Sequence, residues 1–146
     1  MKNIEIACKL YDAFSRHDGE TMSSLYTENS EFSDPVFPNL RGPEIGAMWR
    51  RLCSSGKDLK IEYKIVAEPT ATSVVVQWDA YYTFSKTGRR VHNIITATLE
   101  THDGRIVNHV DSFSFWRWSR QAFGVLGIAV GWTGWFQRKV QSLAKK

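Results

Sequence analysis

The sequence contains few cysteines and no long apolar run. Only two of its 146 residues are cysteines, Cys8 and Cys53, and both fall in segments with helical periodicity. Such a pair forms no disulfide framework, so we expect reduced thiols. No apolar run approaches the roughly 20 residues that a membrane-spanning helix needs. Glu5 interrupts the place where a signal peptide would have its apolar region. These absences favour a cytoplasmic protein without a transmembrane segment.

Several sequence motifs of metal-binding, cofactor-binding and catalytic sites are also missing. The four histidines, at positions 17, 92, 102 and 109, lack the spacing of a metal site. There is no glycine-rich phosphate loop, no dinucleotide fingerprint and no nucleophile elbow. We therefore expect neither a metal nor a cofactor.

Acidic residues are absent after Asp111, although the whole chain carries a net charge of only +4. The end of the chain is consequently basic, which fits a nucleic-acid or membrane surface. It fits equally a solvated helix whose cations lie near its C-terminal dipole. No nucleic-acid motif accompanies the charge, so we favour the second interpretation and expect no nucleic-acid partner.

The chain has ample material for one core, with 42% hydrophobic and 13% aromatic residues. Apolar residues recur at helical spacing over residues 4–14, 20–26 and 43–52. Proline at the start of the last segment, after Gly42, marks a helix start. A short strand is expected at residues 31–33.

After residue 58 the period changes to that of strands, which are predicted at residues 59–65, 73–84, 90–101 and 105–118. Asp103-Gly104 marks a tight hairpin turn between the last two. Helices followed by an antiparallel meander predict an α+β fold. We expect a single domain over residues 1–146, in which residues 121–146 form a C-terminal helical extension.

Asp34 is a candidate catalytic residue. It lies where a strand meets an Asp-Pro turn, beside the apolar residues Phe32, Val36 and Phe37. A carboxylate in apolar surroundings has a raised pKa and can carry a proton near neutral pH. The alternative is that Asp34 only hydrogen-bonds the backbone of its own turn.

The segment 26–52, with its Asp-Pro-Val, resembles the ketosteroid isomerase and SnoaL-like branches of the nuclear-transport-factor-2-like superfamily. Residues 87–91 and 103–111 are similar to SnoaL-like polyketide cyclases, and the resemblance covers about residues 5–125. It implies a cone-shaped α+β barrel, in which the N-terminal helices pack in a strongly curved, mostly antiparallel sheet, and a homodimer. It also implies that Asp34, or an acid on the last strand, is a general acid/base without metal or cofactor.

Asp111 is the corresponding acid on the last strand, and strand alternation places it on one face with His109, Phe113 and Phe115. Asp is unfavourable in mid-strand, so its presence requires an offsetting role. We expect it to line a pocket and to form an acid/base pair with His109. The alternatives are that His109 is only a hydrogen-bonded core residue and that Asp111 points outward to an arginine, Arg90 or Arg117.

Tyr11 is a further candidate, because the isomerases place a tyrosine donor on their first helix; a core tyrosine is the alternative. Their second donor, a protonated aspartate, would fall near Thr96, where this chain has no acid, which disfavours steroid isomerisation. The remaining residues expected to line an apolar cavity are Trp49, Trp78, Tyr82, Asn93 and Phe113.

Two functions follow from these patterns. The first is a cofactor-independent isomerase, cyclase or dehydratase acting on a small hydrophobic carbonyl compound. The second is a non-catalytic module that binds a lipophilic molecule or a protein partner.

We expect a homodimer through the outer sheet face, which carries Val75 and Ile94. The apolar residues 121–136 should cover the cavity mouth or a partner subunit, or alternatively contact a membrane surface.

Overall fold

The computed structural model describes residues 2–37, 39–124, 137–138 and 141. The elements, in chain order, are the helices and strands α1 (Asn3–Ser15), α2 (Gly19–Ser24), β1 (Tyr26–Ser33), β2 (Leu40–Arg41), α3 (Pro43–Ser55), β3 (Lys60–Thr70), β4 (Ser73–Phe84), β5 (Arg89–His102), β6 (Arg105–Ser112) and α4 (Phe115–Phe123).

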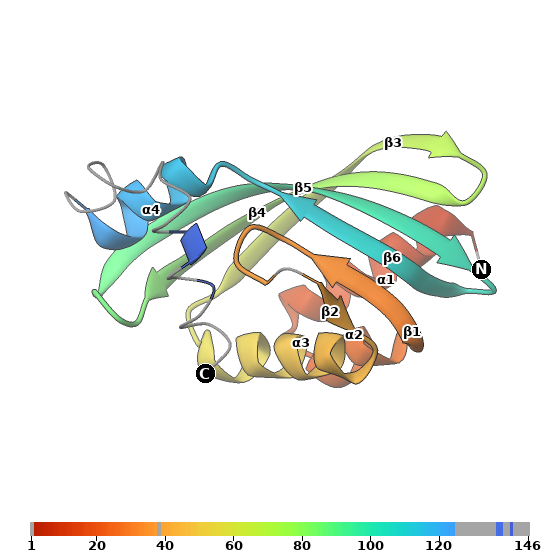
Figure 1. Ribbon diagram of the computed structural model, residues 1–146, viewed down its shortest axis with the longest axis horizontal. Coiled ribbons are helices and arrows are strands. Elements are labelled where there is room, and N and C mark those ends of the chain that lie inside the picture. The colour runs from red at the N-terminus through yellow and green to blue at the C-terminus, as the bar shows by residue number, and fades with distance from the viewer. Residues whose placement is uncertain (1, 38, 125–136, 139–140, 142–146) are drawn as a thin grey trace.

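The strands form one six-stranded sheet in the order β2-β1-β6-β5-β4-β3 (Figure 1). Only β1 and β6 pair in parallel; every other neighbouring pair is antiparallel. The predicted α+β fold with a mostly antiparallel sheet is thus confirmed. The sheet remains open, because β2 and β3 are its two edges and do not pair with each other.

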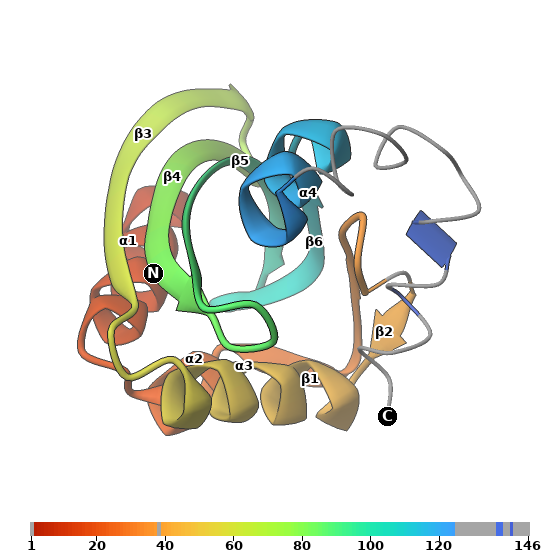
Figure 2. The same cartoon turned by 90° about the vertical axis from the view of Figure 1, so that its left-hand side faces the viewer.

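The sheet is strongly curved, and its helices lie on the concave side. Viewed along the strands, β3, β4 and β5 arch over α1 while α3 lies across the open side of the arch (Figure 2). The alternation of β5 explains the packing, since Val91, Asn93, Ile95, Ala97 and Leu99 are buried and the residues between them are more exposed. Phe14 and Trp49 from the helices complete the core beneath them.

The start of α3 follows from two residues, Gly42 and Pro43. Gly42 has a φ of +49°, and a side-chain carbon there would lie 2.3 Å from the Glu28 carbonyl oxygen, so only glycine fits. Pro43 then occupies the first turn, where its missing N–H removes no hydrogen bond. The predicted helix start is confirmed, and it fixes where α3 lies against β1.

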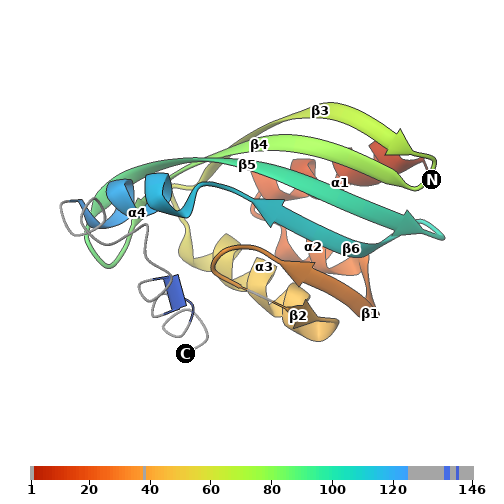
Figure 3. The ribbon, with the colours of Figure 1, turned by 45° about the horizontal axis from the view of Figure 1, so that its top comes forward.

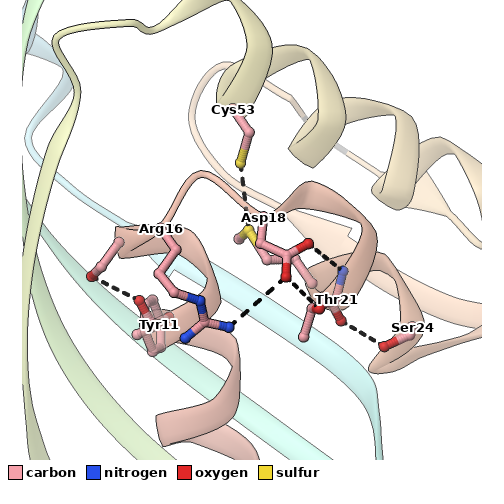
Figure 4. Close-up of polar contacts among 8 residues, drawn as sticks. Tyr11, Arg16, Asp18, Thr21, Ser24 and Cys53 are labelled. Carbon is pink, nitrogen blue, oxygen red and sulfur yellow. Dashed lines mark hydrogen bonds and ion pairs between the residues drawn. The ribbon is translucent and has the colours of Figure 1, made fainter.

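Polar side chains of the turn between α1 and α2 cap α2, which also contacts α3 (Figure 4). The Asp18 side chain caps α2 by accepting hydrogen bonds from Thr21 N at 3.1 Å and Thr21 Oγ1 at 2.6 Å. The Cys53 thiol of α3 contacts Met22 Sδ of α2 at 3.8 Å. Both cysteines are free, as the sequence predicts.

Three predicted strand boundaries are wrong. The strand expected at residues 59–65 is β3, which continues to Thr70. β1 begins at Tyr26, a residue expected at the end of a helix, and not at residue 31. The last strand ends at Ser112 and not at residue 118, because Ser114 accepts a hydrogen bond from Arg117 N at 3.1 Å and caps α4. Phe113 and Phe115 therefore do not continue the strand face of Asp111. The C-terminal helical part begins before residue 121.

α4 lies at the end of the sheet away from α1 (Figure 3). It forms a second apolar cluster with Val91, Phe84 and Tyr82. Residues 125–136, which carry most of the predicted cover over the cavity, lie outside the described residues. Further on, Gln137 Nε2 and Gln141 Nε2 donate hydrogen bonds to the Pro35 carbonyl, at 3.0 and 2.7 Å. Within the described part of the chain, no helix is sufficiently long and apolar to traverse a bilayer.

Candidate acid/base site

His109 and Asp111 form a buried pair on the inner face of β6. They are 0% and 5% exposed, and His109 Nε2 lies 2.7 Å from Asp111 Oδ1. Residues two apart on a strand point to the same face, which explains why their side chains meet. The outward alternative for Asp111 is wrong, and Arg90 instead pairs with Asp58 at 2.8 Å.

Tyr26 completes a chain of three polar side chains. Its hydroxyl lies 2.8 Å from His109 Nδ1, and both groups are buried. Burial raises the pKa of Tyr26 well above its usual value, so the phenol remains protonated and has a hydrogen to donate. Because the Asp111 carboxylate can only accept, a neutral His109 has its proton on Nε2, and Nδ1 then accepts from the Tyr26 hydroxyl. One oxygen of Asp111 is thereby held, while the other has no protein partner within the described residues.

Asp34 begins the turn after β1, where its Oδ1 accepts hydrogen bonds from the N–H groups of Val36 at 2.7 Å and Phe37 at 2.5 Å. The turn role expected as an alternative is therefore present. The carboxyl group is nevertheless half-buried, and burial raises its pKa to about 6. The Phe37 N–H opposes this rise, and the charge of Asp111 adds to it. Asp34 is thus both a turn former and a group that titrates near neutral pH.

Asp111 is the electrostatic centre of the site. Its charge adds to the effect of burial in raising the pKa of Asp34, and it also raises the pKa of Tyr11 and of Tyr26. Asp111 thus contacts His109 directly and acts through its charge on Asp34 and Tyr11, so the fold links four candidate residues of the sequence. For Tyr11, burial is the main cause of a strongly raised pKa, so its hydroxyl stays protonated and has a hydrogen to donate.

Three buried donors have no hydrogen-bond partner among the residues described: Tyr11 Oη, Trp49 Nε1 and Trp78 Nε1. Leaving such a group unpaired costs about 1–3 kcal/mol. Trp49 Nε1 approaches the Tyr26 oxygen, where it opposes the rise of that phenol's pKa, but the contact falls short of hydrogen-bond geometry. The other two donors remain available to a bound molecule or to water.

The remaining predicted lining residues divide between the core and α4. Asn93 is 7% exposed on the inner face of β5. Tyr82 accepts a hydrogen bond from Trp118 Nε1 of α4 at 2.7 Å, and burial raises its pKa to about 12. Phe113 packs against both apolar clusters despite having left the strand. A separate shallow hollow at the β1–β2 edge contains, among others, Glu31, Arg41 and Asn108, but none of the predicted site residues.

Local sequence patterns do not indicate two residues that contact the site, Tyr26 beside His109 and Trp118 beside Tyr82. Tyr26 was placed at the end of a helix, and its contact with His109 spans 83 positions, so no local spacing indicates it. Trp118 was placed on the last strand, although the Ser114 cap signalled a helix. Across the described ranges, no three His, Cys, Asp or Glu side chains gather closely enough to bind a metal ion.

The fold is that of a SnoaL-like protein. The family model of the SnoaL-like domain matches residues 8–109, which begin within α1 and extend to His109. The chain belongs to this family. No match to the sequence was found among curated proteins.

Solved structures with the same fold carry several descriptions. A candidate polyketide cyclase from Xanthomonas campestris pv. campestris has a TM-score of 0.71 and 17% identity, covering 82% of this chain and 96% of its own. An LEH-like epoxide hydrolase of M. tuberculosis has a TM-score of 0.65 and 18% identity, covering 87% and 94%. A ketosteroid isomerase-like protein from Catenulispora acidiphila, in complex with trimethylamine, has a TM-score of 0.69 and 13% identity, covering 81% and 92%. At such identities the likeness establishes the fold alone.

Proposed function

We propose that this protein is a cofactor-independent enzyme that moves protons on a small, neutral, hydrophobic carbonyl compound. The observation that carries the proposal is the pair of carboxyl groups of the half-buried Asp34 and the buried Asp111, each with one oxygen held by the protein and the other without a protein partner among the described residues. Pairs of carboxyl groups in different environments commonly divide into an acid and a base.

Asp111 is the proposed base. The neutral His109, oriented by Tyr26, donates to Oδ1 and leaves Oδ2 to accept a proton from the carbon next to the carbonyl. Tyr11 lies within electrostatic range of Asp111 and has an unpaired hydroxyl. A hydrogen bond from that hydroxyl would stabilise the negative charge that develops on the carbonyl oxygen as the proton leaves.

Asp34 is the proposed acid. With a pKa of about 6 it is protonated in about half of the molecules at pH 6 and in about a tenth at pH 7. A proton delivered by Asp34 to a second carbon gives isomerisation, and one delivered to a leaving hydroxyl gives dehydration. Ring closure also fits, when the enolate carbon attacks a carbonyl and Asp34 protonates the new alkoxide.

Exchange of hydrogen for deuterium at the carbon next to a ketone tests the shared first step. We expect wild-type protein to catalyse exchange in D₂O for members of a panel of cyclic ketones, followed by NMR. The Asp111→Asn variant should lose about 10²-fold or more of the rate, the usual contribution of a general base. Asp58→Asn, which changes a surface carboxylate, is the matched control and should exchange at the wild-type rate. Equal rates in wild type and Asp111→Asn would refute the proposal.

The alternative function is non-catalytic binding of a lipophilic molecule in the same interior. It is favoured by the aromatic rings packed near His109, where Phe32 and Trp49 flank the imidazole and Phe14 packs against Trp49. The two functions differ in the exchange experiment: a binding protein would take up the ketones, but its Asp111→Asn variant would show the same background exchange as the wild type.

A further inference from the structure

Trp78 and Tyr11 are neighbouring aromatic residues, and each carries a donor that is unpaired among the described residues. Trp78 lies on the inner face of β4 and is 7% exposed, whereas Tyr11 on α1 is fully buried. Their ring centroids are 5.9 Å apart with an angle of 40° between the planes. Neither the indole N–H nor the phenol O–H has a hydrogen-bond partner among the residues that the structure describes.

An aromatic residue that only filled space would require no donor at these positions. Buried donors are nearly always paired, with protein groups or with ordered water, because an unpaired one loses its hydration without compensation. The two donors belong to neighbouring rings, and the Asp111 charge acts on Tyr11, so an acceptor atom placed at both would satisfy them together. Trp49 is different, since its N–H is directed at the Tyr26 oxygen.

We propose that the Trp78 indole N–H and the Tyr11 hydroxyl together bind the oxygen of a neutral ketone, so that Trp78 is a second substrate-binding donor. This inference rests on the proposed function, because it places the ketone whose proton Asp111 would remove. It adds the ligand's orientation: the oxygen points toward the junction of α1 and β4.

The surroundings specify the kind of ketone. Phe14 lies 5.4 Å from Trp78 and Tyr63 lies 5.3 Å from Tyr11, measured between ring centroids, so aromatic rings flank both donors. Aromatic faces of this kind favour flat, cyclic or conjugated molecules. The charge of Asp111 disfavours an anion such as a carboxylate at the same position. A neutral cyclic ketone fits both conditions.

A matched pair of probe molecules measures how much the ketone oxygen contributes to binding. 1-Tetralone and tetralin share a bicyclic skeleton, but only the ketone carries an acceptor. We expect wild-type protein to bind 1-tetralone about 10-fold or more tightly than tetralin, the size of effect given by pairing a buried donor. The Trp78 indole N–H signal in ¹H–¹⁵N spectra should move downfield with the ketone and not with the hydrocarbon.

Two variants remove one donor each and keep an aromatic ring. Trp78→Phe and Tyr11→Phe should each lose several-fold in affinity for 1-tetralone while binding tetralin as before. Trp116→Phe, at an indole on the surface of α4 that is 38% exposed, is the matched control. Thermal melts establish that each variant is folded, and the wild-type indole signal provides a readout that requires no variant.

The outcomes separate this inference from the proposed function. Asp111→Asn should retain the preference for the ketone while losing exchange. If the ketone preference is present but no exchange occurs, the proposed chemistry is wrong and the donor pair stands. Equal affinity for the two probes, no saturable binding of 1-tetralone, or an unmoved Trp78 indole signal would each overturn the donor pair.

Discussion

His109 Nε2 lies 2.7 Å from Asp111 Oδ1, two residues further along the same face of β6. The pair is buried beside the aromatic rings of Phe32 and Trp49, whose centroids are 4.8 and 6.0 Å from the imidazole. In such surroundings an ionised carboxylate requires a donor. A neutral histidine provides one and leaves the second carboxylate oxygen available.

The protonation of His109 is the first prediction. We expect long-range ¹H–¹⁵N spectra at pH 7.5 to show the neutral form with its proton on Nε2, because the Tyr26 hydroxyl donates to Nδ1. Tyr26→Phe removes that donor, and we expect it to lower the free energy of unfolding by about 1–2 kcal/mol. The Tyr63→Phe variant is the control, since it deletes a phenol bonded to Asp12 and leaves His109 unchanged. An Nδ1–H form in the wild type would contradict the proposed relay.

The ionised Asp34 carboxylate should lower the free energy of unfolding at neutral pH. Its pKa is about 6 in the folded protein and 3.8 is the reference for the unfolded chain, so the folded state binds the proton more tightly. Folding stability should therefore fall as pH rises from about 4 to about 6. Asp34→Asn keeps an acceptor for the turn and cannot ionise, so it should be more stable than wild type at pH 7 by about 1–2 kcal/mol. The difference should disappear below pH 4, as measured by urea unfolding at both pH values.

The same pKa predicts the pH dependence of turnover. If Asp34 donates a proton, kcat/KM for an identified ketone should decrease as pH rises through about 6, the value at which the acid loses its proton. Asp34→Asn should lose this limb of the profile together with most of the turnover. A rate that instead increases through pH 6 would mean that Asp34 is the base, and the roles of the two carboxyl groups would be exchanged.

Local sequence patterns predicted much of this site, and long-range pairing accounts for what they missed. Asp34, the Gly42-Pro43 helix start and the His109–Asp111 pair each follow from residues a few positions apart. Tyr26 does not, because its meeting with His109 depends on the parallel register of β1 against β6, in which Tyr26 pairs with Ile106. The segment 113–118 is rich in aromatic residues, and such a segment fits a buried strand as well as a short helix. Its composition therefore predicts a strand where α4 begins.

The Ser114 cap should control the position of α4. Ser114→Ala removes the acceptor for Arg117 N and should lower the free energy of unfolding by about 1 kcal/mol. Fraying of the first turn should also loosen the Trp118–Tyr82 hydrogen bond. Hydrogen exchange of the α4 amides measures both effects, and Ser112→Ala, at an exposed strand end, is the control. Unchanged protection of α4 would show that packing alone holds the helix.

The outer face of the sheet is the proposed dimer interface. Val110 on β6 is 40% exposed and Ile94 on the neighbouring β5 is 38% exposed, so two apolar side chains on adjacent strands face solvent in a single chain. We expect sedimentation to show a dimer at micromolar concentration, because contact with a second copy removes such side chains from water. The double variant Ile94→Lys/Val110→Lys should be a folded monomer, since like charges on facing sheets repel and the inner face is unchanged.

Val66→Lys, at a residue that is 54% exposed on the edge strand β3, is the matched control and should remain dimeric. A monomeric wild type would contradict the prediction, and a dimeric double variant would move the interface to another face.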